Sequence, residues 1–447
     1  MKNKNRICLY VITGLFLLSP ALKTSAQDYL ISFAGTGAST TVSSVIAGNL
    51  TQCTTVTLNA GDVLHLGTVG INETDVNENS MHIFPNPMTE QSELSFFAKQ
   101  AGNVLLAVYD ISGKKVLQIR DRISLGIQRF QLIGLQQGMY FINIRGDGYF
   151  YKAKLISLNP SQSEVIIRYV GNEKHEAVTG TLKSTSSTVN MAYTTGDLLL
   201  FKGVSGNYKT VVTDIPSGDT TITFNFAACT DFDNNNYSVV QTGTQMWMAE
   251  NLKTTHFSDG TTLVDGTGAG DIYGDYTTKY WFVYNDSMYY KDTYGLLYTW
   301  AAVMNGASSS DANPSGVQGI CPSGWHVPGD AEWKQMEMFL GMSQPEADAF
   351  GLRGTNEGGK LKETCSEFWI SPNSGATDST GFTALPGGNR NDNGTFNDLG
   401  SNGYWWSATG YDASYAWSRS LVYDYAQVVR FDYGKSNGFS IRCTRDY

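Results

Sequence analysis

Oxygen-bearing side chains alternate in one acidic segment, and their spacing is that of metal ligands. Asp231, Asp233 and Asn235 follow each other as in the first half of a calcium-binding loop, and carboxylate and amide oxygens suit Ca²⁺. Such a loop needs a glycine at its sixth position and a glutamate at its twelfth, where this chain has Asn236 and Thr242. Two interpretations follow, a structural calcium site and, favoured, a turn rich in Asp and Asn.

Aromatic residues and arginines recur near the C-terminal end of the chain. Such side chains give large and rigid contact areas that stack on sugars or insert into protein pockets. The competing interpretation is that they alternate along strands, with half of them in the core. The predicted ligand surface consists of Tyr411, Tyr415, Trp417, Arg419, Tyr423, Tyr425, Arg430 and Tyr433.

Sequence signatures of catalysis are missing. The chain has no Gly-x-Ser-x-Gly, no His-Glu-x-x-His and no phosphate-binding loop. His326 has no second histidine near it in sequence, so we predict a hydrogen-bonded core residue rather than a metal ligand. We therefore expect no enzymatic activity and no cofactor other than the structural calcium considered above.

The composition is typical of a secreted β protein with several domains. Only 16% of the 447 residues are charged, and glycine (47) and tyrosine (25) are abundant. The net charge of -10 argues against nucleic acid as a partner, because binding to phosphate backbones depends on clustered Lys and Arg. The expected partner is an extracellular carbohydrate or protein.

The N-terminus has the pattern of a secretory signal peptide. Lys2, Lys4 and Arg6 precede an apolar stretch that ends near Leu22, and small residues follow it. We predict a signal peptide over residues 1–27 and no membrane span in the mature chain. The expected location is secreted or on the cell surface, with the periplasm as an alternative.

Five cysteines remain after the predicted cleavage, and export places them where disulfides persist. Their odd number leaves at least one without a partner in the chain, and their spacing is not that of a zinc or redox site. They are Cys53, Cys229, Cys321, Cys365 and Cys443.

Short alternating runs separated by Gly, Asn and Ser predict strands through the first half of the chain. The segments 59–64 and 194–199 are similar, which indicates that the regions containing them are related units or pair together. All nine tryptophans lie after Cys229, so a separate domain begins there. The predicted parts are a signal peptide (1–27), a β segment with a linker (28–80), a β-sandwich (81–157), a second β segment (158–228) and a C-terminal domain (229–447).

Helices are predicted only in the C-terminal domain. One runs from Asp330 to Leu340, with Asp330 capping its first turn and Trp333 and Met336 on the same face as Leu340. A second is predicted over 295–304.

Four motifs of the predicted sandwich carry a resemblance. They are Phe84-Pro85-Asn86-Pro87, Tyr109-Asp110-Ile111-Ser112-Gly113, Leu135-x-x-Gly138-Met139-Tyr140 and Lys152-Ala153-Lys154-Leu155. Together they resemble the type IX secretion sorting domain, which normally lies at the extreme C-terminus, where the export machinery reads it. Because this copy is internal, a purely structural sandwich and an active sorting signal both stay open.

The C-terminal domain carries a second resemblance through blocks in a fixed order. Among them are Gln245-Met246-Trp247-Met248-Ala249-Glu250-Asn251-Leu252, Cys321-Pro322-Ser323-Gly324-Trp325-His326-Val327-Pro328, Tyr404-Trp405-Trp406-Ser407-Ala408-Thr409 and Ile441-Arg442-Cys443. They resemble the Fibrobacter succinogenes major paralogous domain, itself similar to the formylglycine-generating-enzyme and C-type-lectin-like fold. The expected fold class is a mainly β N-terminal half of β-sandwich modules plus an α+β, C-type-lectin-like C-terminal domain with long irregular loops.

The second resemblance also implies a disulfide and a function. In C-type-lectin-like folds a bridge joins the helical region to the final strand, which implies a Cys321–Cys443 disulfide here. The enzymatic branch uses a reactive cysteine pair with copper, and neither Cys365 nor Cys443 lies in a matching motif. We expect an exported, non-catalytic, adhesin-like protein that binds carbohydrate or protein through its C-terminal domain. The alternatives are a structural component of a surface assembly and a degenerate formylglycine-generating-type enzyme.

Overall fold

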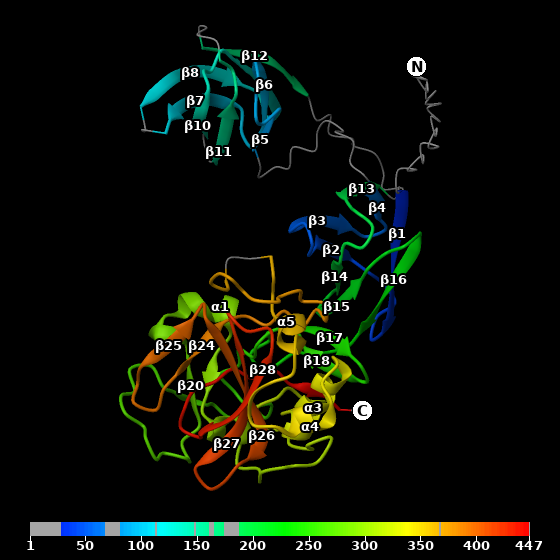
Figure 1. Ribbon diagram of the computed structural model, residues 1–447, viewed down its shortest axis with the longest axis vertical. Coiled ribbons are helices and arrows are strands. Elements are labelled where there is room, and N and C mark those ends of the chain that lie inside the picture. Colours follow the sequence, from blue (N-terminus) through cyan, green and yellow to red (C-terminus); the bar gives the residue numbers. More distant parts are fainter. Residues whose placement is uncertain are drawn as a thin grey trace, which may run out of the picture. The chain divides into compact units, whose positions relative to one another are not determined.

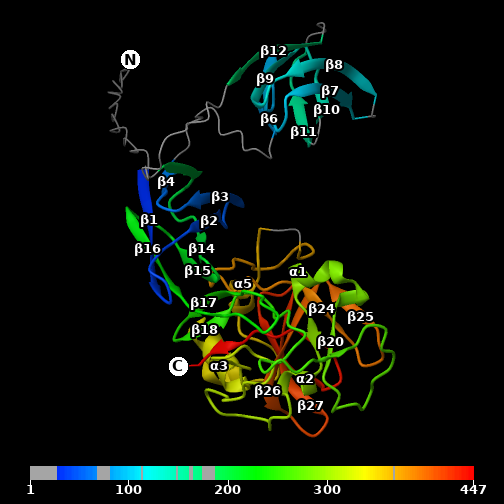
Figure 2. The same ribbon diagram turned by 180° about the vertical axis from the view of Figure 1, so that it is seen from behind.

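Strands dominate the protein, as the sequence predicts, and the few helices lie in its C-terminal part (Figures 1 and 2). The computed structural model describes residues 28–67, 81–111, 114–146, 149–160, 165–173, 187–365 and 368–446, so the predicted signal peptide lies outside the described residues. The chain forms two compact units. We call the described parts of 28–67 and 187–446 unit 1, and those of 81–173 unit 2. No described helix is long and apolar enough to cross a membrane.

Unit 2 consists of two four-stranded antiparallel sheets around one core. Strand β9 (Gly126–Ile133) shows why, because every second residue of it is buried, which gives the strand one face toward the core. One sheet has the order β11 (Tyr149–Ser157), β10 (Gly138–Gly146), β7 (Gly102–Asp110), β8 (Lys115–Ile123). The other has the order β12 (Ile166–Glu173), β9 (Gly126–Ile133), β6 (Gln91–Ala98), β5 (Met81–Phe84). Strand β12 thus belongs to this unit, although it lies in the β segment predicted over 158–228.

Unit 1 begins with strands from two distant segments that pair with each other, which was one of the two interpretations of their similarity. A four-stranded sheet has the order β13 (Thr188–Ala192), β4 (Val63–Gly67), β1 (Asp28–Gly37), β16 (Thr220–Phe226). The β1–β16 and β4–β13 pairings are parallel. Unit 2 is therefore inserted between two strands, β4 and β13, that are hydrogen-bonded neighbours.

We call the described residues 28–67 and 187–228 of unit 1 the N-terminal module. An eight-stranded sheet continues from this module into the C-terminal domain. Its order is β22 (Trp325–His326), β29 (Thr444–Arg445), β18 (Gln245–Met248), β17 (Ser238–Thr242), β15 (Tyr208–Asp214), β14 (Leu199–Ser205), β2 (Ser44–Asn49), β3 (Thr54–Asn59). The junction is the parallel β15–β17 pairing, which includes Thr210 and Val239. A Cys53–Cys365 disulfide also joins the two parts.

Two further sheets belong to the C-terminal domain. The larger has the order β23 (Gly351–Arg353), β28 (Val428–Gly434), β27 (Tyr415–Val422), β26 (Asn402–Gly410), β24 (Gly387–Arg390), β25 (Phe396–Leu399). The smaller has the order β19 (Val264–Asp265), β20 (Tyr280–Phe282), β21 (Leu297–Tyr298). Two clusters of buried side chains pack between these sheets, the end of the long sheet and the helices, and five fully buried tryptophans contribute to them.

The helices are short, and the structure corrects two details of their prediction. They are η1 (Tyr284–Asp286), η2 (Met288–Tyr290), α1 (Lys291–Tyr294), α2 (Trp300–Met304), α3 (Asp330–Phe339), α4 (Gln344–Asp348) and α5 (Glu357–Leu361). Helix α3 confirms the longer predicted helix, but Gly329 is its N-cap, and the Asp330 carboxylate points into the domain to pair with arginines. The region predicted as a second helix over 295–304 begins as strand β21 instead, and only its last turn is helical.

Candidate functional site

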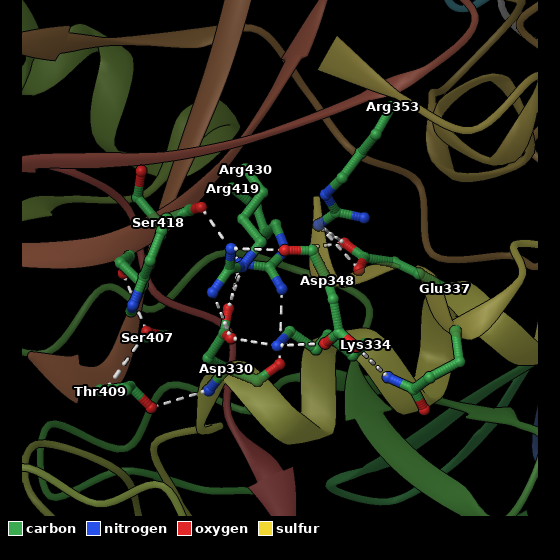
Figure 3. A network of polar contacts seen from close by, with 12 residues as sticks. Asp330, Lys334, Glu337, Asp348, Arg353, Ser407, Thr409, Ser418, Arg419 and Arg430 are labelled. Atoms are coloured by element: carbon green, nitrogen blue, oxygen red, sulfur yellow. Dashed lines mark hydrogen bonds and ion pairs between the residues drawn. The ribbon is translucent and has the colours of Figure 1, made fainter. Parts of the chain in front are cut away.

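A buried network of charges lies where helix α3 packs on strands β27 and β28 (Figure 3). Asp330 Oδ1 accepts a hydrogen bond from Arg419 Nη1 at 2.8 Å. Arg430 makes a bidentate contact with the same carboxylate, Nε to Oδ1 and Nη2 to Oδ2, both at 2.8 Å. Two turns along the helix, Glu337 Oε1 accepts hydrogen bonds from Arg419 Nε at 2.7 Å and from Arg353 Nη2 at 3.0 Å. The helix and three strands are thereby held by alternating charges.

Burial makes this network sensitive to the loss of any partner. Burial opposes ionisation of Asp330, but Arg419 and Arg430 outweigh it and hold the pKa of this carboxyl well below its ordinary value. Burial lowers the pKa of Arg353 to about 10, although Glu337 counteracts this effect. Asp330 and Arg353 therefore stay charged at neutral pH. Removing one partner from such a buried pair typically costs about 3–5 kcal/mol, because the other charge stays buried.

The structure divides the predicted ligand surface. Arg419 and Arg430 are 1% and 6% exposed and belong to the buried network, because carboxylates on α3 compensate their charge there. Tyr423 and Tyr433 are partly buried and pack against the two hydrophobic clusters. The exposed members are Tyr411, Tyr415 and Tyr425, and Trp417 is half-buried.

The exposed members do not form one surface. Tyr411 precedes β27 and Tyr415 begins it, whereas Tyr425 lies in the turn that follows it. A strand of this length spans about 25 Å, so Tyr425 lies at the other end of the β27–β28 hairpin. Tyr425 is therefore separate from the other exposed aromatic residues.

Four aromatic rings form a chain of contacts at the first end of the hairpin, and we call Phe350, Tyr411, Trp417 and Phe431 the aromatic patch. The ring centres are 5.2 Å apart for Tyr411 and Trp417, 5.8 Å for Trp417 and Phe350, and 4.5 Å for Phe350 and Phe431. Tyr411, Phe350 and Phe431 are 55%, 51% and 37% exposed. The patch gathers residues from β27, β28 and two connecting segments.

The aromatic patch rests on the charge network. The Arg430 guanidinium lies 3.4 Å from the centre of the Trp417 ring. Two nitrogens of this guanidinium, Nε and Nη2, donate hydrogen bonds to Asp330. Stacking of a cation on an indole ring is favourable and restricts the orientation of both groups. Asp330 therefore fixes Arg430, and Arg430 in turn fixes the orientation of the half-buried Trp417 ring.

The calcium candidates do not converge. Asp231 accepts hydrogen bonds from the backbone and side chain of Asn235, at 2.9 and 2.8 Å. Asp233 faces another segment instead, where it accepts from Thr255 N at 2.6 Å and contacts His256 Nδ1 at 2.6 Å. These are the contacts of an Asp- and Asn-rich turn. Within the described ranges, no group of three or more His, Cys, Asp or Glu side chains could hold a metal ion.

His326 is buried and hydrogen-bonded. Its Nε2 lies 2.6 Å from Glu332 Oε1 and its Nδ1 lies 2.6 Å from Asp446 Oδ1, and Thr444 also contacts Nε2. Burial acts to lower the pKa of His326, but the contacts with Glu332 and Asp446 outweigh it and raise the pKa. The histidine therefore ties the C-terminal strand β29 to α3.

Two disulfides account for four cysteines. The Cys321–Cys443 bridge implied by the resemblance is present and joins the segment before β22 to the segment before β29. The Cys53–Cys365 bridge was not predicted, because its partners lie 312 residues apart in sequence. Cys229 is free and buried, and burial raises its pKa well above the ordinary value, which makes it unreactive.

Comparison with family models finds two matches, one within unit 1 and one within unit 2. Residues 240–445 match the Fibrobacter succinogenes major domain. The match spans the charge network, the aromatic patch and the Cys321–Cys443 bridge. Residues 82–158 match the secretion system C-terminal sorting domain, so both resemblances are confirmed, and the chain is an exported or cell-surface protein. No curated protein and no solved structure matches the chain, and the C-type-lectin likeness of the major domain stays a prediction.

The sorting domain is internal in the fold as well as in the sequence. Its match ends at residue 158, directly after β11, and the structure adds strand β12 through antiparallel pairing with β9. Its two ends lead back to β4 and β13 of unit 1. Both interpretations of this domain, sorting signal and structural sandwich, stay open.

The major domain has a second exposed aromatic group that the sequence analysis missed. Tyr284, Tyr289, Tyr290, Tyr294 and Phe368 form a chain of ring contacts with centres 5.2–6.2 Å apart, which we call the tyrosine cluster. Tyr289 is 83% exposed. The close spacing of four tyrosines in the sequence could have predicted this cluster. Phe350 of the aromatic patch gave none, because it stands alone in a connecting segment.

Proposed function

We propose that this protein binds an extracellular carbohydrate or protein through the aromatic patch of its major domain. The observation that carries the proposal is a chain of contacts among four aromatic rings, three of them exposed, at one end of the β27–β28 hairpin. Exposed aromatic clusters are unusual on soluble proteins unless they bind something, because they cost solvation free energy. Export to the cell surface supplies the matching class of partners.

Rigidity favours the aromatic patch over the tyrosine cluster. The patch lies on the largest sheet of the major domain and is supported by the Arg430–Trp417 stack. The tyrosine cluster lies on short helical turns that include Asn285 in a left-handed conformation. A binding surface that is ordered beforehand loses less entropy when its ligand arrives. The proposal therefore places the ligand at the patch and involves no catalytic step.

The test should use the chain from residue 28 to residue 447, not the major domain alone. Removing the N-terminal module would expose the edge of β17 that pairs with β15 and would leave Cys365 without its partner. The chain is applied to an array of glycans and to a panel of purified extracellular proteins. Two variants are compared with it, Tyr411→Ala combined with Phe350→Ala, and Tyr289→Ala as the matched control.

We expect a ligand that binds the unaltered chain and the Tyr289→Ala variant equally, and the double variant at least about tenfold more weakly. Both altered patch residues are more than half exposed, so the double variant should fold. Loss of binding in Tyr289→Ala alone would move the site to the tyrosine cluster and contradict the proposal. Self-association that the double variant abolishes, without any other ligand, would favour a structural component of a surface assembly.

A further inference from the structure

A groove separate from the aromatic patch lies between helix α3 and the turn that joins β17 to β18, which are neighbours in both views (Figures 1 and 2). Its volume is about 510 Å³, within the range of small-ligand sites. The groove is lined by Gln241, Thr242, Gly243, Thr244, Gln245, Gln335 and Phe339.

The lining is neutral and rich in hydrogen-bonding groups. Three side-chain amides and two hydroxyls surround the groove, and no charged side chain is among the described residues that line it. An amide presents a donor and an acceptor side by side, and a hydroxyl can act as either. This combination suits a ligand whose own groups both donate and accept, which is the property of neighbouring sugar hydroxyls.

Phe339 supplies an apolar surface beside these groups. Its side chain is 63% exposed at the end of α3. Gly243, with φ of +60°, lies against the ring, and a Cβ atom at that position would come within 2.9 Å of Phe339 Cδ2. The absence of a side chain at Gly243 therefore leaves room for the Phe339 ring at the groove. Aromatic faces accept the C–H face of a pyranose by stacking.

Two polar atoms of the groove residues have no partner. Thr242 and Gln245 are 2% and 3% exposed, and Thr242 Oγ1 and Gln245 Oε1 make no hydrogen bond to any described residue. A buried polar group without a partner costs about 1–3 kcal/mol, but both atoms are buried, so a ligand in the groove does not reach them. Gln335 is already fixed, because it donates to Thr244 at 2.8 Å and accepts from Asn313 at 2.6 Å.

We propose that this groove binds a neutral saccharide, with one sugar ring stacked on Phe339 and its hydroxyls bonded to the amides of Gln241 and Gln335. Gln241 donates one N–H to the Gly243 carbonyl and Gln335 bonds Thr244 and Asn313, which leaves each amide a second N–H hydrogen and an acceptor lone pair for the sugar. An anionic sugar is disfavoured because no cation lines the groove. The site shares no residue with the aromatic patch, so the two proposals can fail independently.

The experiment is calorimetric titration of the chain from residue 28 to residue 447 with cellohexaose, xylohexaose, mannohexaose and laminarihexaose. An anionic galacturonic acid hexamer serves as the comparison ligand. The variants are Phe339→Ala and Gln335→Ala, with Phe232→Ala as a matched control, because Phe232 is a 52% exposed phenylalanine outside the groove. Tyr411→Ala reports on the aromatic patch.

We expect at least one neutral hexasaccharide to bind with a Kd below 1 mM. Its affinity should fall at least about tenfold in Phe339→Ala and less in Gln335→Ala, and stay within twofold, roughly the scatter of a non-contact site, in Phe232→Ala and Tyr411→Ala. The proposal is overturned if none of the neutral hexasaccharides binds, if Phe339→Ala binds as well as the unaltered chain, or if only the anionic hexamer binds. Loss of affinity in Tyr411→Ala alone would assign the sugar to the aromatic patch and also overturn it.

Discussion

Unit 2 and unit 1 are both rich in strands but are assembled in opposite ways. The pairings of unit 2 join strands within residues 81–173, and its core is one cluster. In unit 1, β1 pairs with β16 about two hundred residues later, the two disulfides span 312 and 122 residues, and charges on α3 hold β27 and β28. A sequence-local fold can be inserted elsewhere as a block, whereas a fold built from distant segments depends on the interactions that bring them together.

The largest expected effect comes from breaking the charge network. Asp330→Ala leaves Arg419 and Arg430 buried without their shared carboxylate, and we expect the free energy of unfolding of unit 1 to fall by about 3–5 kcal/mol. Calorimetry should show a lower transition temperature for unit 1 and an unchanged transition for unit 2. Asp348→Ala is the matched control, because Asp348 is half-exposed and should cost less than about 1 kcal/mol. Equal losses in the two variants would contradict a special role for the buried network.

A smaller effect is expected from removing the Cys53–Cys365 disulfide. Changing Cys53 and Cys365 together to Ser removes a closure over 312 residues, and we expect unit 1 to lose about 2–4 kcal/mol. Denaturant titration of the double variant checks this. Unit 2 lies inside the closed loop but should unfold as before, and a parallel loss of stability there would mean that the units are not independent.

The pH dependence of unit 1 should carry a contribution from His326. Because contacts with Glu332 and Asp446 raise its folded-state pKa above the ordinary value of about 6.5, this stabilisation is complete below pH 6.5 and is lost as the pH rises through the raised pKa. We expect His326→Gln to be less stable than the unaltered chain at pH 6, with a difference that shrinks toward pH 9. Denaturant titrations at both pH values test this, and a constant difference would rule out the histidine charge as the cause.

The smallest effect is expected from removing the inserted unit. Strands β4 and β13 pair in parallel, Val63 with Thr188 and Gly67 with Ala192, so a connection must return along about 13 Å of strand. A Gly/Ser linker of about ten residues in place of residues 70–183 can span this distance. We expect the transition temperature of unit 1 to change by only a few degrees. Failure of this variant to fold would show that unit 1 requires the insertion.

The sequence predicts the locally paired unit 2 better than unit 1, which is built from distant segments. The sandwich of unit 2 was predictable because alternation and turn residues are local signals, as in β9. Helix α3 was predictable from its apolar face. The aromatic patch was predicted only in part, because Phe350 joins it through the fold, while Tyr425 has the same residue type but lies at the far end of the hairpin.

The sequence by itself determined the β-rich class, the two recognisable domains and the acidic, export-compatible composition, because each follows from residue type and short-range spacing. Only the tertiary structure decided which charged and aromatic residues face solvent. Arg419 and Arg430 look like surface residues in the sequence and are buried, because Asp330 and Glu337 on a helix some ninety residues earlier compensate their charge. Burial of a charge depends on a partner that local spacing does not reveal.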